Sequence, residues 1–152
     1  MGERVREQPW SDDRPSHGRI LVLTDNPIAR AIAVVGAAVG RDVVVQPDDD
    51  GGPGLSPSAG DAVVLCDHDA PDAPAVLRTA LASPASYVAM MASRRRAAGL
   101  LEELGREGVD VSTLHVPAGH DLGGKGPGEI ALSVVAEIVA ESYGRPGGPM
   151  RG

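Results

Sequence analysis

The stretch RILVLTDNPIAR (residues 19–30) decides the predicted fold, because it joins the pattern of a buried strand to that of a helix. Residues 20–23 are four consecutive apolar side chains, as in a strand that is covered on both faces. Asn26 and Pro27 are residues typical of a helix N-cap and of the first helical position. In many nucleotide-binding proteins a glycine loop cradles phosphate at this junction, yet the stretch contains no glycine.

The rest of the chain repeats this alternation of strand and helix patterns. We predict further strands at 43–45, 61–66, 86–91 and 112–116, and helices at 27–39, 73–81, 94–104 and 127–143. The segment 46–60 is rich in Pro, Gly and Asp, so we predict no regular helix there. Alternating elements with right-handed crossovers predict an α/β fold: a three-layer Rossmann-like sandwich on a five-stranded parallel sheet, in the order 2-1-3-4-5.

Composition indicates one globular domain. The chain has 152 residues, and we expect residues 1–18 to be a disordered tail, 19–144 the folded domain and 145–152 a flexible C-terminal tail. Phenylalanine is absent, so aliphatic side chains must fill the core. The formal net charge of −7 argues against a general nucleic-acid or anionic-membrane binder. No signal peptide or membrane-spanning run is evident, and Cys66 is the only cysteine, so we expect a soluble cytoplasmic protein.

Polar and charged residues that can bind a ligand follow several of the predicted strands. Ligands of such sheets bind outside the carboxyl ends of the strands, so we expect a binding site there. The candidate residues are Asn26, His68, Asp69, Ser93, Arg94, Arg95, Gly119, His120, Asp121, Gly123, Gly124 and Lys125.

The cysteine and the histidines do not form a recognisable zinc spacing, and we predict no metal site and no catalytic residue. Cys66 is interpreted as a buried small hydrophobe and His115 as structural. His68 is left open between a base, a ligand of an anion and a hydrogen-bonded histidine at a strand end.

Three arginines follow Ser93, at the start of the predicted helix 94–104. Cations in the first turn oppose the helix dipole, each at a cost of a few tenths of a kcal/mol, and a bound anion would reverse that effect. Alternatively, the arginines extend into water and pair with acids such as Glu102 or Glu103. The glycine-rich segment 119–125 can fold as an anion-binding nest with Lys125 beside it, or serve as a flexible connection.

The junction after the first strand does not suit a dinucleotide. Aligned with G-x-G-x-x-G/A, it offers Thr24, Asn26 and Ala29, of which only Ala29 fits the pattern. Asp25 adds negative charge where a pyrophosphate would lie. We therefore do not expect NAD or FAD to bind at this loop.

Three segments carry a resemblance to a known family. They are DAVV (61–64) with His68-Asp69, LRTALASPASYVAMMASRRR (77–96) and PAGHDLGGKGPGEIALSVVAEIVA (117–140). In these segments the chain resembles the C-terminal Rossmann-like domain of the XdhC/CoxI family, the xanthine dehydrogenase accessory factors. That family usually has a glycine-rich loop where this chain has residues 24–29, and another strand and helix where it has the loop 48–60.

The resemblance implies a maturation factor and not a catalyst. Such a factor binds the molybdenum cofactor (molybdopterin, or its cytosine dinucleotide form) and assists its insertion into a molybdenum hydroxylase such as xanthine or carbon monoxide dehydrogenase. The resemblance also implies contact with the machinery that sulfurates the cofactor, and it is compatible with a homodimer. The residues that fall on family motifs are His68, Asp69, Ser93, Arg94, Arg95, Gly119, Asp121, Gly123 and Glu129.

Other functions remain open at this point. One is a regulatory or scaffolding partner of such an enzyme that has lost its ligand. Another is a receiver-like phosphoacceptor domain, which carries two acids, a hydroxyl and a lysine at the ends of its strands. In this chain Asp25 follows the first strand, Asp67 the third, Ser93 the fourth and Lys125 the fifth. An NAD(P)-type enzyme of another kind is the last.

Overall fold

The computed structural model describes residues 17–46 and 56–151. Over these residues the chain forms a five-stranded parallel sheet in the order β2-β1-β3-β4-β5, which confirms the predicted fold class and strand order. The strands are β1 (Ile20–Leu23), β2 (Val43–Val45), β3 (Ala62–Leu65), β4 (Tyr87–Met90) and β5 (Leu114–His115). The helices are α1 (Pro27–Ala38), α3 (Ala73–Ala82), α4 (Arg94–Glu107) and α5 (Pro127–Ser142).

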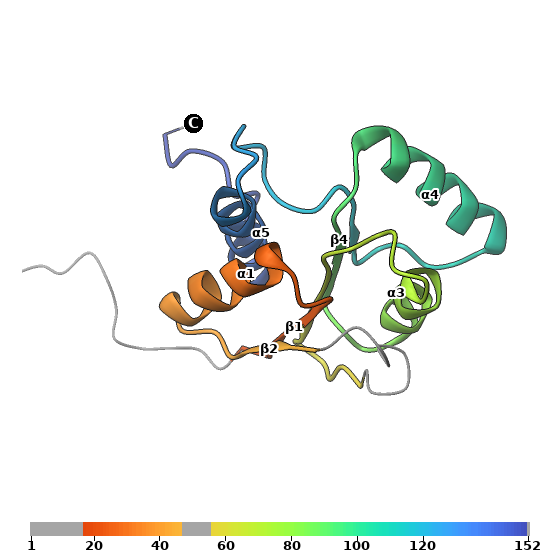
Figure 1. Ribbon diagram of the computed structural model, residues 1–152, viewed down its shortest axis with the longest axis horizontal. Coiled ribbons are helices and arrows are strands. Elements are labelled where there is room, and N and C mark those ends of the chain that lie inside the picture. Colours follow the sequence, from red (N-terminus) through yellow and green to blue (C-terminus); the bar gives the residue numbers. More distant parts are fainter. Residues whose placement is uncertain (1–16, 47–55, 152) are drawn as a thin grey trace, which may run out of the picture.

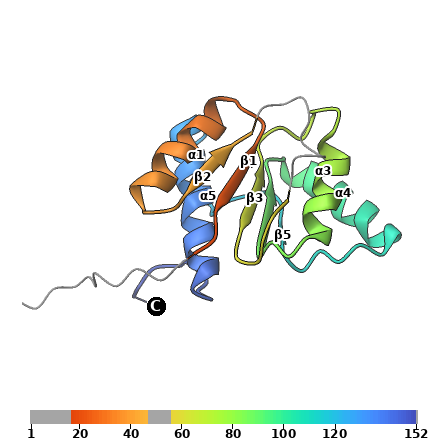
Figure 2. The ribbon, with the colours of Figure 1, turned by 90° about the horizontal axis from the view of Figure 1, so that it is seen from below.

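The helices form one layer on each face of the sheet (Figures 1 and 2). Helices α1 and α5 cover one face, while α3 and α4 cover the other. Alternate residues of each buried strand enter the two resulting cores: Ile20 and Val22 face α1 and α5, whereas Leu21 and Leu23 face α3 and α4. Aliphatic side chains fill both cores, as the absence of phenylalanine requires.

Two elements differ from the sequence prediction by more than one residue at an end. Helix α4 continues beyond Leu104 to Glu107, because its last turn is polar and leaves no apolar signal, and it ends at Gly108 with φ +73°. Strand β5 is confined to Leu114 and His115, and only β4 pairs with it among the described strands.

Some sequence predictions lie wholly or partly outside the described residues. The predicted absence of a helix in 46–60 concerns mainly residues 47–55, and the predicted N-terminal tail concerns mainly residues 1–16, which are not described. Residues 145–151 are described and form neither helix nor strand. In the described part of the chain, no helix combines the length and apolar character needed to cross a bilayer.

Candidate functional site

The connection between β4 and α4 places the arginine run at the carboxyl edge of the sheet. Ser93 has extended backbone angles, and its hydroxyl accepts the N–H of Arg96 at 3.1 Å, so it caps α4. Arg96 pairs with Asp69 at 3.0 Å, and Arg94 lies 3.7 Å from Asp121. The arginines therefore do not pair with Glu102 or Glu103 of their own helix.

The connection between β5 and α5 is folded tightly against α5. Gly119 has φ +95°; its N–H donates to the Glu137 carboxylate at 3.1 Å, and a side chain at this position would collide with Ser133. Gly124 likewise leaves no room for a side chain, because the carboxylate of Glu129 occupies that space. The glycines of this segment therefore serve close packing as well as turn geometry.

These two connections enclose a pocket of about 510 Å³ together with the starts of α1 and α5. We call it the carboxyl-edge pocket. Its lining residues are Ile28, Met91, Ala92, Ser93, Arg94, Pro117, Ala118, His120, Asp121, Leu122, Gly123, Gly124, Lys125, Ile130 and Ser133. Two cations, Arg94 and Lys125, face one carboxylate, Asp121, so the pocket favours an anionic ligand.

The pocket brings together seven of the predicted site residues: Ser93, Arg94, His120, Asp121, Gly123, Gly124 and Lys125. Gly119 begins the same loop. His120 lies under Gly147, and within the described residues its buried Nε2 has no hydrogen-bond partner. An unpartnered buried nitrogen is unfavourable, so the loop holds an unused polar atom beside the pocket.

Asn26 does not line this pocket, because both ends of its side chain are used within the fold. The Asn26 Oδ1 accepts the N–H of Ala29 at 2.9 Å, which is the predicted helix cap. Its Nδ2 donates to the Cys66 carbonyl at 3.2 Å and so joins the ends of β1 and β3. The side chain of Asn26 therefore closes the junction between β1 and α1, where the glycine loop is missing.

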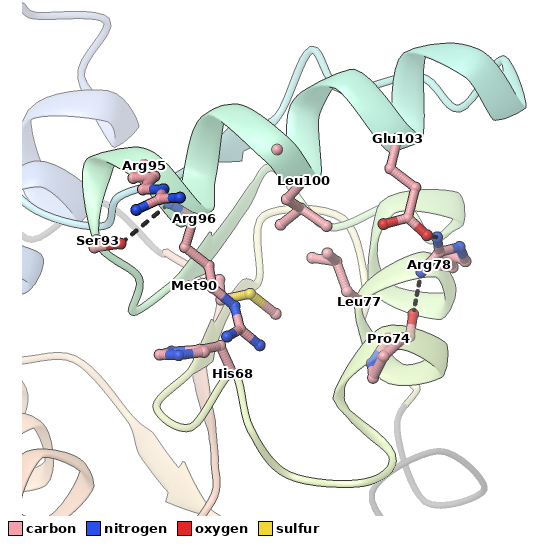
Figure 3. A pocket seen from close by; sticks show the side chains of 11 residues that line it. His68, Pro74, Leu77, Arg78, Met90, Ser93, Arg95, Arg96, Leu100 and Glu103 are labelled. Carbon is pink, nitrogen blue, oxygen red and sulfur yellow. Dashed lines mark hydrogen bonds and ion pairs between the residues drawn. The ribbon is translucent and has the colours of Figure 1, made fainter.

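His68, Asp69 and Arg95 lie on the other face of the sheet. His68 and Arg95 line a second hollow, of about 550 Å³, between α3 and α4, and Ser93 lines both hollows (Figure 3). The Nδ1 of His68 lies 2.8 Å from the Met91 carbonyl, which makes Nδ1 a donor, and its Nε2 lies 3.4 Å from the Asp69 carboxylate. Nine of the twelve residues predicted as one site are therefore divided between two hollows, and Asn26, Asp69 and Gly119 line neither.

Sequence reasoning missed Glu137 of α5. Its Oε1 accepts the hydroxyl of Tyr87 at 2.6 Å as well as the N–H of Gly119, and it lies 3.7 Å from His115 Nδ1. Burial, together with the bond to Glu137, raises the pKa of Tyr87, so the hydroxyl remains a donor. The sequence did contain a signal that Glu137 is buried, because it lies on the apolar stripe of its helix, three residues after Val134.

Cys66 and His115 are placed as structural residues. Burial, with a smaller contribution from Asp67, raises the pKa of the Cys66 thiol to about 12, so it is a neutral thiol at physiological pH. His115 stacks on Tyr87 with ring centroids 4.5 Å apart. In residues 17–46 and 56–151, no group of three or more His, Cys, Asp or Glu side chains could hold a metal ion.

Comparisons with known proteins agree with this architecture. Over 70 residues, 44% of this chain and 13% of the relative, it is 39% identical to uncharacterized protein YqeB of Escherichia coli (strain K12). A crystal structure described as a xanthine dehydrogenase from Bacillus halodurans superposes with a TM-score of 0.70 at 19% identity, over 85% of this chain and 44% of that one. The chain thus spans less than half the length of either relative. The sequence model of the family described as XdhC Rossmann domain matches residues 20–138, so the chain belongs to that family.

Proposed function

We propose that this protein is an accessory factor of a molybdenum hydroxylase, and that it binds the molybdenum cofactor or its dinucleotide form in the carboxyl-edge pocket. Family membership supports the accessory role. The observation that carries the binding proposal is that two cations, Arg94 and Lys125, line one pocket in a chain whose net charge is −7. Binding and transfer require no catalytic residue in this protein.

The residues present fit an anionic pterin in size and charge. A volume of about 510 Å³ is within the usual range of small-molecule pockets. A phosphate between Arg94 and Lys125 would accept charge-assisted hydrogen bonds. When bound, the cofactor supplies the redox chemistry of the client enzyme and none to this chain.

Asp121 in the same pocket can assist release of the ligand. Asp121 lies 3.7 Å from Arg94, and both side chains are more than 80% exposed, so their attraction is weak. A phosphate could displace Asp121 when the ligand enters, and Asp121 could return to Arg94 when the ligand leaves. Moderate affinity of this kind suits a protein that must hand its ligand to another.

The dinucleotide form is compatible with the proposal only if its phosphates avoid the junction after β1. Asn26 fills that junction, and Asp25 adds negative charge beside it. The expectation that NAD and FAD do not bind there stays a prediction. A molybdenum hydroxylase as client, contact with the sulfuration machinery and a homodimer are likewise part of the proposal.

The test is cofactor retention through purification from a host that makes the cofactor. Molybdenum and the oxidised pterin would be quantified by mass spectrometry and fluorescence in wild type and in Arg94→Gln/Lys125→Gln. Each lost charge-assisted bond contributes about 1.5–3 kcal/mol, so retention should fall at least tenfold. Arg30→Gln is the matched control, because Arg30 is an exposed cation in the helix after β1 that does not line the pocket.

Two results would contradict the proposal. If the wild type carries no pterin from a competent host, the ligand-free regulatory or scaffolding role becomes the better reading. If Arg30→Gln reduces retention as much as the double variant, general charge and not the pocket governs binding.

A further inference from the structure

We propose that the hollow between α3 and α4, here called the α3–α4 pocket, is a second ligand site that takes a nucleoside monophosphate. This inference goes beyond the proposed function, because α3 and α4, whose residues line the pocket, lie on the opposite face of the sheet from α1 and α5 (Figure 2). Its volume of about 550 Å³ is in the range of small-molecule sites.

The floor of the α3–α4 pocket is apolar. Leu77 of α3 and Met90 of β4 are 0% and 4% exposed, and Leu100 of α4 approaches from the opposite side (Figure 3). Leu77 and Met90 close the bottom of the hollow, and the half-buried Leu100 offers its apolar side chain to the face of a planar ring.

The gap between the two helices is bridged at one end. Arg78 of α3 donates to Glu107 of α4 at 2.7 Å through Nε, and it also reaches Glu103. Leu77 of α3 and Leu104 of α4 also pack in one apolar cluster. The two helices that form the walls of the pocket are therefore held together by packing and by this ion pair.

Gly99 keeps this space open at a cost to the helix. It lies in the interior of α4 and lines the pocket, and a Cβ at this position would meet no atom within 4 Å. Glycine inside a helix is about 1 kcal/mol less favourable than alanine. Since no part of the described chain needs the missing side chain, the room it leaves is available to a ligand.

Charge at the pocket selects an anion. Arg95 and Arg96 line the end near Ser93; Arg96 pairs with Asp69, whereas Arg95 has no carboxylate within 4 Å among the described residues. Arg78 is already paired with Glu107. Arg95 is thus the cation available to a phosphate, which guanidinium groups bind in a two-pronged geometry.

The remaining polar groups favour a heterocycle over a fatty acyl chain. The Glu103 carboxylate lies at the far end of the pocket, and its one bond among the described residues, from Arg78 at 3.5 Å, leaves it further lone pairs. An acyl chain would leave this carboxylate beside hydrocarbon, whereas the amino group of a base can donate to it.

The experiment is calorimetric titration of the whole protein with the four common nucleoside 5′-monophosphates. At least one should bind with a dissociation constant on the order of 10–100 µM, as expected for a ligand of this size in a partly open pocket. Inorganic phosphate, the matching nucleoside and decanoate should each bind at least tenfold more weakly. Arg95→Gln should weaken nucleotide binding about tenfold.

Gly99→Leu gives the sharpest test, because it fills the pocket while favouring the helix. Nucleotide affinity should fall more than tenfold, and the melting temperature should not decrease. Gly105→Leu is the matched control: Gly105 is in the same helix, a Cβ there also meets open space, and it does not line the pocket. Its nucleotide affinity should stay within twofold of wild type.

Several outcomes overturn the inference. They are no nucleotide binding by the wild type, undiminished binding by Gly99→Leu, and decanoate binding as tight as the nucleotide. Lys125→Gln separates the two sites, because it should reduce cofactor retention and leave nucleotide affinity unchanged. Loss of nucleotide binding in Lys125→Gln alone would assign the nucleotide to the carboxyl-edge pocket and also overturn the inference.

Discussion

The two edges of the sheet use their charged side chains in different ways. At the amino edge, Asp61 is 2% exposed, and its carboxylate accepts the N–H of Arg19 at 2.7 Å, the guanidinium of Arg19 at 2.8 Å and the N–H of Ser58 at 2.8 Å. At the carboxyl edge, Arg94 has only the distant Asp121. The charge of Asp61 is therefore satisfied within the fold, whereas Arg94 is available to a partner even though its neighbour Arg96 is paired with Asp69.

This difference indicates which charged residues should affect stability and which should affect ligand binding. A charge that is buried and hydrogen-bonded is costly to remove, because its partners are left without their bonds. An exposed charge without a close partner contributes little to folding. Substitutions at the two edges should therefore have opposite profiles.

The largest effect is expected for Asp61→Ala. The substitution leaves two backbone N–H groups and a guanidinium without their acceptor, and we expect a loss of about 3 kcal/mol, allowing for the partial exposure of Arg19. Urea denaturation measures it. Asp110→Ala is the control, because Asp110 is exposed and accepts from Ser112 alone. A loss below 1 kcal/mol for Asp61→Ala would remove the contrast between the edges.

Stability should also depend on pH through Asp61. Burial by itself would raise the pKa of Asp61, but the bonds from Arg19 and Ser58 lower it below its ordinary value. The stabilisation is thus complete above the unfolded pKa, about 4, and is lost as the pH falls through the lower folded pKa. Asp61→Asn should flatten this acid-side decline in melting temperature. An unchanged slope would show that other carboxylates cause it.

The second effect is expected for Asn26→Ala, at the closed junction of the carboxyl edge. It removes a helix cap worth about 1 kcal/mol and the bond to the Cys66 carbonyl, also about 1 kcal/mol, so the loss should be about 2 kcal/mol. Asp25→Ala is the control, since Asp25 pairs only with the exposed Arg30. Equal losses for both variants would mean that Asn26 does not close the junction.

Much of the fold could be predicted because apolar patterning encodes burial directly. Residues 20–23 and 62–65 read as doubly covered strands, and both are buried at every position. Right-handed crossovers then left one reasonable strand order. Asn26 and Ser93 were recognisable as caps, since capping depends on local sequence.

The arrangement of the candidate site was less accessible from the sequence. Arg94 and Arg95 are adjacent, so sequence reasoning assigned them to one site, but successive helical residues point about 100° apart and these two line different hollows. Glu137 was missed because its partners, Tyr87 and Gly119, are distant in sequence. Contacts of this kind depend on how elements pack.

A smaller effect is expected for Ser93→Ala, which removes a cap from an exposed helix start. The hydroxyl accepts one N–H, from Arg96, so the loss should be about 1 kcal/mol. Asp72→Ala is the matched control, because Asp72 occupies the N-cap of α3 without a side-chain cap bond. Thermal denaturation should show the smaller shift for Asp72→Ala. The reverse order would mean that the cap of α4 contributes little.

The smallest effect on stability is expected for Arg94→Gln/Arg95→Gln, at the carboxyl edge of the sheet. Both cations lie in the first turn of α4, where they oppose the helix dipole, so their removal should change stability by no more than a few tenths of a kcal/mol and in the favourable direction. The weak contact of Arg94 with Asp121 adds little in the opposite sense, because both side chains are exposed. The same variant should lose cofactor retention through Arg94 and nucleotide affinity through Arg95. Melting temperature and both binding assays decide the matter together. A clearly lower melting temperature with unchanged binding would make the arginines structural and would favour the ligand-free scaffold.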